Sequence, residues 1–505
     1  MYLLGIDIGT SSAKCVLADR FGKVRAAASR DYPLSVPRPG WAEQEAGDWE
    51  QAMYEGIRQL LSTPGISAGD IDGISFSGQM HGLVALDREG RVIRKPFLWC
   101  DQRTQKQCDE IEAAAGGREQ LIGMTNNVML TGYTGGKLLW LKEEEPQHYA
   151  AMTTFQCPKD YVRYCLTGQI VMDVSEASGV GFFDTKNRRW CIDLIRAAGL
   201  DEKIFPPTVE SVDVAGYVTE EAARKTGLLP GTPCFAGGGD AVVQSFASGL
   251  LKAGTVGTVI GTSGNVSMGF EKYTVNPGGK LQAFCSVTPG SYMSFGATQT
   301  AGGALRWFRD QLARDVKEQA RLEGRNSYDL LGELAMQSPP GARGVVFAPY
   351  LSGERCPYPD PDARGVLYGI SLNTDRCDVA RAVMEGIVFS LSQIVDIYKS
   401  FTPVTGAVAS GGGAGSNVFL QMQADAFELP VYTVSAAEEG GAYGAALIAG
   451  MGLGVFASPE EALGALKKEK EFRPIEENVK LCRNTYRLYR EIYPALKDVY
   501  KLGAK

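Results

Sequence analysis

One aspartate stands in a glycine-rich stretch near the middle of the 505-residue chain. The stretch CFAGGGDAVVQSFASG spans residues 234–249, and three glycines directly precede Asp240. Glycine allows a backbone to approach a ligand closely, and a carboxylate at the mouth of such a turn can take a proton from a substrate hydroxyl. The stretch by itself favours a plainer interpretation, in which Asp240 only caps the helix that follows. The other motifs have to decide between the two.

Two further turns contain the residue types of phosphate-binding loops. Residues 9–12 read Gly-Thr-Ser-Ser and follow an apolar segment that contains Asp7, while residues 261–264 read Gly-Thr-Ser-Gly. Glycine amides and hydroxyls at such turns can surround a phosphate, and a carboxylate at a strand end can hold Mg²⁺ through water. A plain hairpin with a polar turn would show the same letters, so neither turn is specific alone.

The elements around these turns repeat. The segments at 2–19 and 254–268 both predict strand, Gly-Thr-Ser turn, strand, and this repetition suggests duplicated halves. A glycine loop at 411–417 precedes a predicted helix at 419–429, whose first amides could meet a phosphate. A long helix is expected over 378–399, with Asp378 as its N-cap. Together these units predict an α/β protein with two like halves and a nucleotide held across the cleft between them.

Composition narrows the class of protein. A net charge of −7 and 58 acidic residues argue against a protein that grips a nucleic-acid backbone. Eleven cysteines without a C-x-x-C pair are typical of a reducing compartment. No basic leader and no apolar run of membrane-spanning length is present, so we expect a cytoplasmic protein without membrane or nucleic-acid partners. His81 and His148 sit in different contexts, which excludes a histidine-rich metal site.

These parts suit phosphoryl transfer. That reaction needs amides and Mg²⁺ on the phosphates, an oriented acceptor hydroxyl and a base that takes its proton. Asp240 has the residue type for the base, and the two Gly-Thr-Ser turns have the types for the phosphates. The P-loop motif G-x-x-x-x-G-K-[ST] is absent, which excludes a P-loop enzyme.

Over nearly its whole length the chain resembles the FGGY family of carbohydrate kinases, and within that family the xylulokinases. The motifs that carry the resemblance are DIGTSSAK (7–14), SGQMHG (77–82), LWCDQRT (98–104), PKDY (158–161), AGGGD (236–240), IGTSG (260–264), PYLSGER (349–355) and GGGAGSN (411–417). The resemblance implies two duplicated actin/hexokinase-like, ribonuclease H-like α/β domains with the active site in the interdomain cleft. Residues 1–247 would bind the sugar. Residues 248–505 would bind ATP and end in C-terminal helices.

The resemblance also assigns roles. ATP with Mg²⁺ would phosphorylate D-xylulose to D-xylulose 5-phosphate, with Asp240 as general base and Asp7 holding the metal through water. The sugar pocket would contain Met80, His81, Trp99 and Asp240. The nucleotide-binding residues would be Thr10, Ser11, Ser12, Lys14, Gly261, Thr262, Gly302, Gly413 and Asn417. Plainer interpretations stay open for three of them: His81 as a structural histidine, Met80 as core filler and Lys14 as a surface charge. The family also implies a homodimer.

Three positions depart from the family pattern. Ala241 stands where xylulokinases usually have Asn, Cys100 replaces the Asn of W-N-D-x-R, and Gly415 stands where the nucleotide loop usually has a basic residue. A lost hydrogen bond can change discrimination between substrates strongly. A kinase for another sugar or polyol, such as ribulose, ribitol or gluconate, therefore stays open. A nucleotide-dependent sensor or chaperone without turnover is a third reading, against which the intact Asp240 and sugar loop argue.

Overall fold

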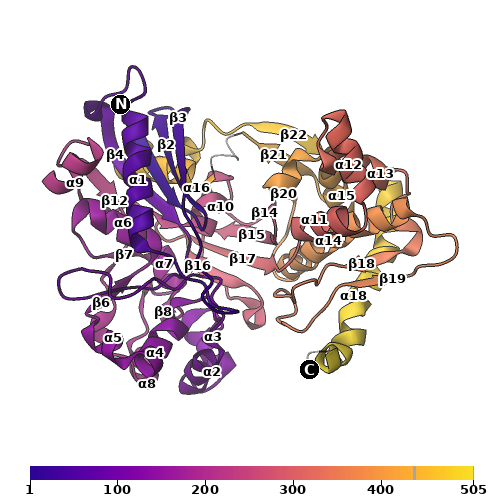
Figure 1. Cartoon of the computed structure of the whole chain (residues 1–505), viewed down its shortest axis with the longest axis horizontal. Helices are drawn as coiled ribbons and strands as arrows, with labels where there is room; N and C mark the ends of the chain where they lie inside the picture. Colours follow the sequence, from indigo (N-terminus) through magenta and orange to yellow (C-terminus); the bar gives the residue numbers. More distant parts are fainter. Residues whose placement is uncertain (436–439, 504–505) are drawn as a thin grey trace. The chain divides into compact units, whose positions relative to one another are not determined.

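The computed structural model describes residues 1–435 and 440–503 (Figure 1). The chain folds into two compact units, each made of three segments. Unit 1 comprises Met1–Leu251, Gly269–Ser294 and Glu439–Leu466, and unit 2 comprises Lys252–Met268, Phe295–Glu438 and Lys467–Lys505. The assignment of sugar binding to 1–247 and ATP binding to 248–505 stays a prediction.

A mixed sheet forms the centre of unit 1. Its strand order is β11-β12-β4-β1-β2-β3, and the short β13 also pairs with β4. Strand β1 runs antiparallel to β2 and parallel to β4, so the Gly-Thr-Ser turn at 9–12 connects neighbouring strands as predicted. The strands are β1 (Tyr2–Ile8), β2 (Ser12–Asp19), β3 (Val24–Asp31), β4 (Ile71–Gly78), β11 (Val214–Tyr217), β12 (Pro233–Phe235) and β13 (Gly238–Gly239).

The second large sheet repeats this arrangement. Its order is β16-β17-β15-β14-β20-β21-β22, in which β14 runs antiparallel to β15 and parallel to β20. Read from β22, the first five strands match β11-β12-β4-β1-β2 in order and in every relative direction, so the predicted repeat is confirmed. The strands are β14 (Thr255–Ile260), β15 (Gly264–Phe270), β16 (Gln282–Cys285), β17 (Tyr292–Thr298), β20 (Gly406–Ser410), β21 (Val431–Val434) and β22 (Lys468–Phe472).

The side chains of β1 point alternately to the two faces of the first sheet, and each face is covered by a different helix. Leu4, Ile6 and Ile8 join the core that contains Trp49 of α1 (Ala46–Leu61). Gly5 points the other way, because a Cβ there would lie 1.8 Å from the carbonyl oxygen of Ala442 in α16 (Gly440–Gly452). Successive residues of a strand face opposite sides, so Asp7 shares the α16 face with Gly5. Also packed in this unit are α6 (Pro158–Thr167) and α10 (Asp240–Ala247).

Unit 1 contains a second apolar core, which includes Phe155 and Phe182, and further helices and short strands. The helices are α2 (Gln105–Ala114), α3 (Arg118–Thr125), α4 (Thr134–Glu144), α5 (Pro146–Ala151), α7 (Val174–Ser178), α8 (Ile192–Ala197), α9 (Glu220–Thr226) and α17 (Pro459–Ala462). The short strands are β5 (Val84–Leu86), β6 (Thr154–Gln156), β7 (Met172–Asp173), β8 (Phe183–Asp184), β9 (Arg189–Trp190) and β10 (Thr208–Val209).

The long helix of unit 2 begins earlier than its sequence pattern predicts. It is α14 (Arg376–Lys399), and its N-cap is Asp375 instead of the predicted Asp378. The two carboxylates form a capping box, in which Asp375 accepts the amide of Asp378 and Asp378 accepts the amide of Asp375. The prediction was wrong because both residues suit the cap. Other elements of this unit are α11 (Gly302–Gln311), α12 (Arg314–Glu323), α13 (Ser327–Met336), α15 (Asn417–Phe427), α18 (Glu476–Gly503), β18 (Val346–Ala348) and β19 (Val366–Tyr368).

Within the described residues, none of the helices combines the length and the apolar character needed to cross a membrane.

Candidate active site

Asp240 is the first residue of α10 and directly follows β13. The turn before it requires glycine: Gly237 has φ +75°, and a Cβ there would lie 1.9 Å from the carbonyl oxygen of Phe76. The N-cap position belongs to Gly239, so Asp240 is not the helix cap of the plainer interpretation. Its Oδ1 accepts the amide of Ala241 at 2.6 Å. The chain thus presents one carboxylate at the junction of strand and helix.

The surroundings of Asp240 favour its protonated form. The residue keeps some exposed surface, but burial raises the pKa of its carboxyl to about 7. The negative charge of Asp7 raises this pKa further, while the amide of Ala241 acts in the opposite direction. A carboxylate whose pKa lies near neutrality is suited to general-base catalysis at that pH. The site therefore holds two carboxylates, Asp240 and Asp7, close enough for the charge of Asp7 to raise the pKa of Asp240.

Asp7 lies at the end of β1, on the face covered by α16. A Cβ on Gly441 would lie 2.6 Å from both Asp7 Oδ1 and Ser77 Oγ, so this helix approaches the carboxylate very closely. Burial raises the pKa of Asp7, opposed by the Ser77 hydroxyl and the positive charge of Lys14. Among the residues that the structure describes, Asp7 Oδ1 is buried without a hydrogen-bond partner. An unpartnered buried carboxylate oxygen fits a hydrated cation.

The set of donors fits Mg²⁺ bound chiefly through water and phosphate. In residues 1–435 and 440–503, no group of three or more Asp, Glu, His or Cys residues is arranged to hold a metal. Mg²⁺ commonly keeps several waters and takes one or two carboxylates together with substrate phosphates. Asp7, with Asp240 nearby, meets that requirement, and its role as a metal ligand stays a prediction.

The first Gly-Thr-Ser turn is held by hydrogen bonds from distant segments. Trp99 Nε1 donates to Thr10 Oγ1 at 2.9 Å, and Gln44 Nε2 donates to the carbonyl oxygen of Thr10 at 2.7 Å. Gln79 Nε2 bonds the Gly9 carbonyl at 3.3 Å and Gln44 Oε1 at 3.0 Å. Thr10 and Trp99, predicted for different ligands, are thus in contact. Sequence reasoning missed both glutamines: Gln79 lies in the SGQMHG motif, whereas Gln44 has no such signal.

Three other predicted phosphate-binding residues, Ser11, Ser12 and Lys14, lie in this turn or in the strand that follows it. Ser11 is exposed, and its carbonyl oxygen accepts the amide of Tyr32 at 3.0 Å. Ser12 begins β2, and its carbonyl oxygen accepts the amide of Gly9 at 2.9 Å. Lys14 lies opposite Asp7 in the β1–β2 ladder. The hydroxyls of the turn therefore lie within one short segment beside Asp7.

His81 is held in an unusual backbone conformation after β4. Its φ is +69°, and its carbonyl oxygen accepts from Lys137 Nζ at 2.7 Å and from Thr134 Oγ1 at 3.1 Å. Its Nδ1 lies 3.0 Å from the carbonyl oxygen of Gly179, which can only accept, so Nδ1 carries the proton. In the neutral ring Nε2 is then an acceptor. The buried Lys137, whose pKa burial lowers to about 8, is a supporting residue that sequence reasoning missed.

Met80 packs directly behind the Asp240 turn. It is buried, and a Cβ on Gly239 would meet its side-chain atoms at 2.5–2.7 Å. This position is compatible with both roles considered from the sequence, as core filler and as a wall of the sugar pocket, so its binding role stays a prediction.

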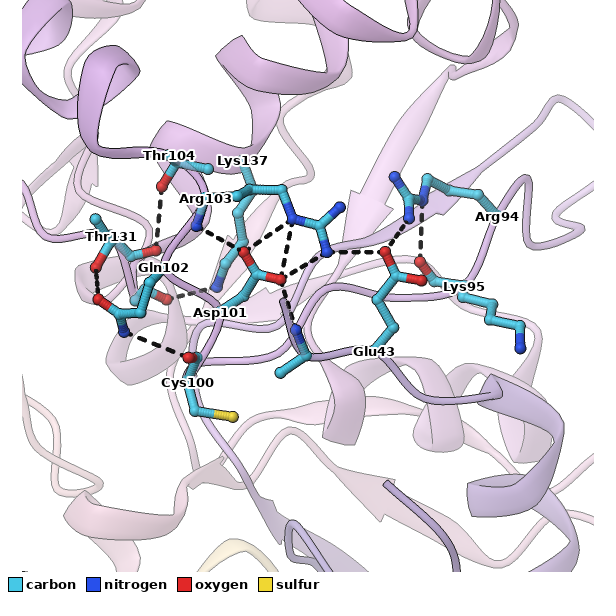
Figure 2. Close-up of polar contacts among 12 residues, drawn as sticks. Glu43, Arg94, Lys95, Cys100, Asp101, Gln102, Arg103, Thr104, Thr131 and Lys137 are labelled. Atoms are coloured by element: carbon cyan, nitrogen blue, oxygen red, sulfur yellow. Dashed lines mark hydrogen bonds and ion pairs between the residues drawn. The ribbon is translucent and has the colours of Figure 1, made fainter. Parts of the chain in front are cut away.

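Figure 2 shows the ionic network that anchors the Trp99 loop. Arg103 donates to both oxygens of the buried Asp101, and its Nη2 also reaches Glu43 at 2.8 Å. Arg94 bonds the same Glu43 oxygen at 2.5 Å. Arg103 also stacks over Trp41, with its guanidinium carbon 3.5 Å from the ring centroid. These contacts fix the loop that carries Trp99, and they give Asp101 and Arg103 a structural role.

In unit 2, the second Gly-Thr-Ser turn joins β14 to β15 and contacts the start of α11. The amide of Gly302 donates to the carbonyl oxygen of Gly261 at 2.8 Å, and the amides of Ala301 and Gly303 donate to that of Thr262. Gly261 and Thr262 themselves are exposed. The predicted nucleotide residue Gly302 thus uses its amide within the protein, which leaves close backbone approach as its contribution to a ligand.

The predicted glycine loop of unit 2 lies against the same strand. A Cβ on Gly413 would lie 2.6 Å from Cβ of Ile260, the last residue of β14, which explains the glycine. Asn417 begins α15, is exposed, and accepts from Lys470 Nζ at 3.1 Å. The structure thus brings Gly261, Gly302 and Gly413 together around the end of β14.

Glu354, in the PYLSGER motif, is a further residue of unit 2 whose role sequence reasoning did not identify. It accepts from Thr298 Oγ1 at 2.7 Å and from the amide of Gln299 at 2.9 Å. Burial raises the pKa of its carboxyl to about 7. Glu354 therefore holds residues 298–299, which lead into α11. The first residues of α11 in turn contact the 261–263 turn.

Comparisons with known proteins agree with this geometry. Residues 2–247 match the N-terminal domain, and residues 256–453 the C-terminal domain, of the FGGY family of carbohydrate kinases. A Bacillus subtilis (strain 168) protein named xylulose kinase is 38% identical over 500 residues, covering 99% of this chain and 98% of that protein. The solved structures of a ligand-bound xylulose kinase and of a gluconate kinase, both from Lactobacillus acidophilus, are each 26% identical, cover 99% of both chains and give a TM-score of 0.92.

Fold, duplicated sheets and matched domains together define a phosphotransferase with two α/β domains of the actin-like ATPase fold. The chain belongs to the FGGY family of carbohydrate kinases. This confirms the family resemblance, the fold class and the enzyme class predicted from the sequence. A small-molecule sugar as acceptor and ATP as donor follow from the family.

Proposed function

We propose that this enzyme transfers the γ-phosphoryl group of ATP to the terminal hydroxyl of D-xylulose, giving D-xylulose 5-phosphate. The xylulose kinase from Bacillus subtilis, at 38% identity over nearly the full length of both chains, supports this sugar. The observation that carries the chemistry is the carboxylate of Asp240, which stands at the start of α10 with a pKa raised to about 7.

Asp240 acts as the general base. Its carboxylate takes the proton from the terminal hydroxyl, the resulting nucleophilic oxygen forms a bond to the γ-phosphorus, and the bond from that phosphorus to the bridging oxygen of ADP breaks. A base of this kind contributes about 10²–10⁴-fold to the rate. Replacement of Asp240 is therefore expected to reduce phosphoryl transfer far more than it reduces substrate binding.

Asp7 and the glycine turns act on the phosphates. When bound, Mg²⁺ held by Asp7 through water would neutralise charge on the phosphate oxygens. The hydroxyls of the 10–12 turn and the exposed 261–262 turn each offer donors to phosphate oxygens, and the buried Gly413 permits close approach at the nucleotide. His81 Nε2 accepts a hydrogen bond from a sugar hydroxyl, since its Nδ1 donates to the Gly179 carbonyl.

A second candidate substrate is a sugar acid or polyol. Ala241 presents a methyl group beside Asp240 where xylulokinases usually present an amide, and the gluconate kinase structure aligns as well as the xylulose kinase structure does. The methyl group cannot donate to a sugar hydroxyl, so discrimination at that position depends on other residues.

The decisive experiment measures ADP release with MgATP and a panel of ketoses, sugar acids and polyols. D-xylulose is expected to give the highest kcat/KM. A higher kcat/KM with gluconate or ribitol would show that D-xylulose is not the preferred substrate, while the proposed kinase activity would stand. If no member of the panel raises ADP release above the rate without sugar, the result would favour a sensor without turnover. In parallel, Asp240→Asn is expected to lose about 10²–10⁴-fold in kcat. A kcat near that of the wild type would remove Asp240 from the base role.

A further inference from the structure

A buried ionic cluster lies directly behind the Asp240 turn in unit 1. Lys159 of α6 and Asp173 of β7 are both fully buried and form an ion pair, with 2.7 Å between Nζ and Oδ1. Lys159 also pairs with Asp160 at 2.6 Å. Asp173 Oδ2 accepts from the hydroxyl of Ser175 at 2.5 Å and from its amide at 2.7 Å. Buried charges are costly unless they are paired, so this cluster needs an explanation.

Both ends of the cluster bond the segment that presents Asp240. Lys159 Nζ donates to the carbonyl oxygen of Ala236 at 3.3 Å, where the segment begins. The amide of Gly239, the residue immediately before Asp240, donates to Ser175 Oγ at 3.0 Å. The two side chains therefore contact both ends of residues 236–239. Only the second half of this segment, Gly238 and Gly239, pairs with β4 as strand β13.

We propose that Lys159, Asp173 and Ser175 form a relay of one ion pair and two hydrogen bonds that positions the carboxylate of Asp240 for proton abstraction. The order is Lys159 ammonium to Asp173, Ser175 hydroxyl to Asp173, and Gly239 amide to Ser175. The proposal rests on the base role of Asp240 proposed above. None of the three contacts the reacting atoms, so they are positioning residues.

The ammonium of Lys159 is stable in the folded protein. Burial lowers the pKa of Lys159, but the carboxylates of Asp160 and Asp173 outweigh burial and raise it, so the ammonium persists. A hydrogen bond to a carboxylate, such as that from Ser175 to Asp173, is shorter and stronger than one between neutral groups. With Asp173 accepting from Ser175, the lone pairs of that hydroxyl remain directed to the Gly239 amide, whose N–H belongs to the N-cap of α10.

The first test replaces Ser175 by Ala and uses Ser178→Ala as a matched control. Both serines are buried in α7 and each accepts one backbone amide; the partner of Ser178 is Cys285 at 3.1 Å, which does not belong to residues 236–241. Each variant loses one accepted and one donated hydrogen bond, and because the bond donated by Ser175 goes to a carboxylate, Ser175→Ala is expected to lower Tm somewhat more. Ser175→Ala should lower kcat by about 10- to 100-fold with the KM values for sugar and ATP within about threefold of wild type. Ser178→Ala should leave kcat within about twofold.

Amide hydrogen exchange measures the positioning directly. Ser175→Ala should speed exchange in the peptide that contains residues 236–241, whereas Ser178→Ala should leave that peptide unchanged. If Ser175→Ala does not fold, Ser175→Cys keeps the volume with a weaker acceptor and should show the same direction of change. Equal kcat in the two alanine variants, or unchanged exchange at 236–241, would overturn the relay. A kcat of Asp240→Asn near wild type would instead overturn the base role.

Discussion

Trp99 Nε1 donates a hydrogen bond of 2.9 Å to the hydroxyl of Thr10. The indole belongs to the loop expected to line the sugar pocket, and the hydroxyl belongs to the turn expected to bind phosphate. The loop that carries Trp99 also contains Asp101 and Arg103, which are bonded to each other (Figure 2). The predicted sugar subsite and the predicted phosphate subsite of unit 1 are therefore joined by the hydrogen bond from Trp99 to Thr10.

Trp99→Phe should disturb both subsites. The phenyl ring keeps most of the apolar contact but has no N–H, so the Thr10 hydroxyl loses its donor and can reorient. We expect KM to rise about 3- to 10-fold for both the sugar and ATP, in line with the loss of one hydrogen bond of about 1 kcal/mol. Steady-state kinetics with each substrate varied in turn would measure this. A change confined to the sugar would show that the Thr10 contact does not matter for the nucleotide.

Asp240→Asn should stabilise the protein at pH 8 and leave its stability nearly unchanged at pH 4. The folded-state pKa of about 7 lies above the ordinary value of 3.8, so the folded state binds the proton more tightly than the unfolded state. Stability attached to that proton is present below the unfolded pKa and is lost as the pH rises through 7. The amide removes this loss, and we expect a gain of about 1–3 kcal/mol at pH 8.

Urea unfolding at both pH values measures this difference. For the same reason, kcat/KM for the sugar in the wild type should rise with pH to a plateau above pH 7. A pH-independent difference in stability between Asp240→Asn and the wild type would contradict the raised pKa.

Gly441→Ala should damage the Asp7 site. The new Cβ would lie 2.6 Å from Asp7 Oδ1 and from Ser77 Oγ, so the helix α16 or the carboxylate must move. Overpacking of this kind costs about 1–3 kcal/mol. Gly47→Ala is the control, because that helical glycine has nothing within 4 Å of its Cβ position and the change should be neutral or stabilising. Thermal unfolding and the Mg²⁺ dependence of kcat should both change for Gly441→Ala only.

Glu354→Ala should weaken ATP use without affecting the sugar. Its carboxylate accepts from Thr298 Oγ1 and the Gln299 amide, ahead of the α11 residues that bond the 261–263 turn. With these bonds lost, the turn should become less ordered, and the KM for ATP should rise about 5- to 30-fold. Glu354→Gln, which keeps one acceptor oxygen, should give a smaller rise. An equal effect on the KM for the sugar would argue for a general loss of stability.

Ala241→Asn should improve use of D-xylulose if that is the sugar. The amide would add a hydrogen bond beside Asp240, and a gain of about 3- to 10-fold in kcat/KM is expected. The ratio of kcat/KM for D-xylulose to that for gluconate is the quantity to measure. An unchanged ratio would show that position 241 does not determine the sugar.

Much of the fold and the candidate site follows from local patterns. The two Gly-Thr-Ser turns lie between paired strands as expected, the two sheets repeat one strand order, and Asp240 starts a helix after a glycine turn. These features depend on alternation, turn chemistry and motif spacing, which are visible along a chain. The family, and with it the enzyme class, depends on the same motifs. The cap of α14 could not be chosen, because Asp375 and Asp378 both suit it and form one box.

Only the tertiary structure decided how these residues are tuned. The raised pKa of Asp240 depends on burial and on Asp7, which comes from the other end of unit 1's first segment. Gly441 faces Asp7 although the two lie near opposite ends of the sequence, and Ser175 bonds Gly239 across 64 positions. Such contacts arise from the packing of helices onto a sheet, and no pattern within one segment specifies them. The amino-acid sequence determined which carboxylate is available for chemistry; the packing around it determined that the pKa of this carboxyl is raised to about 7.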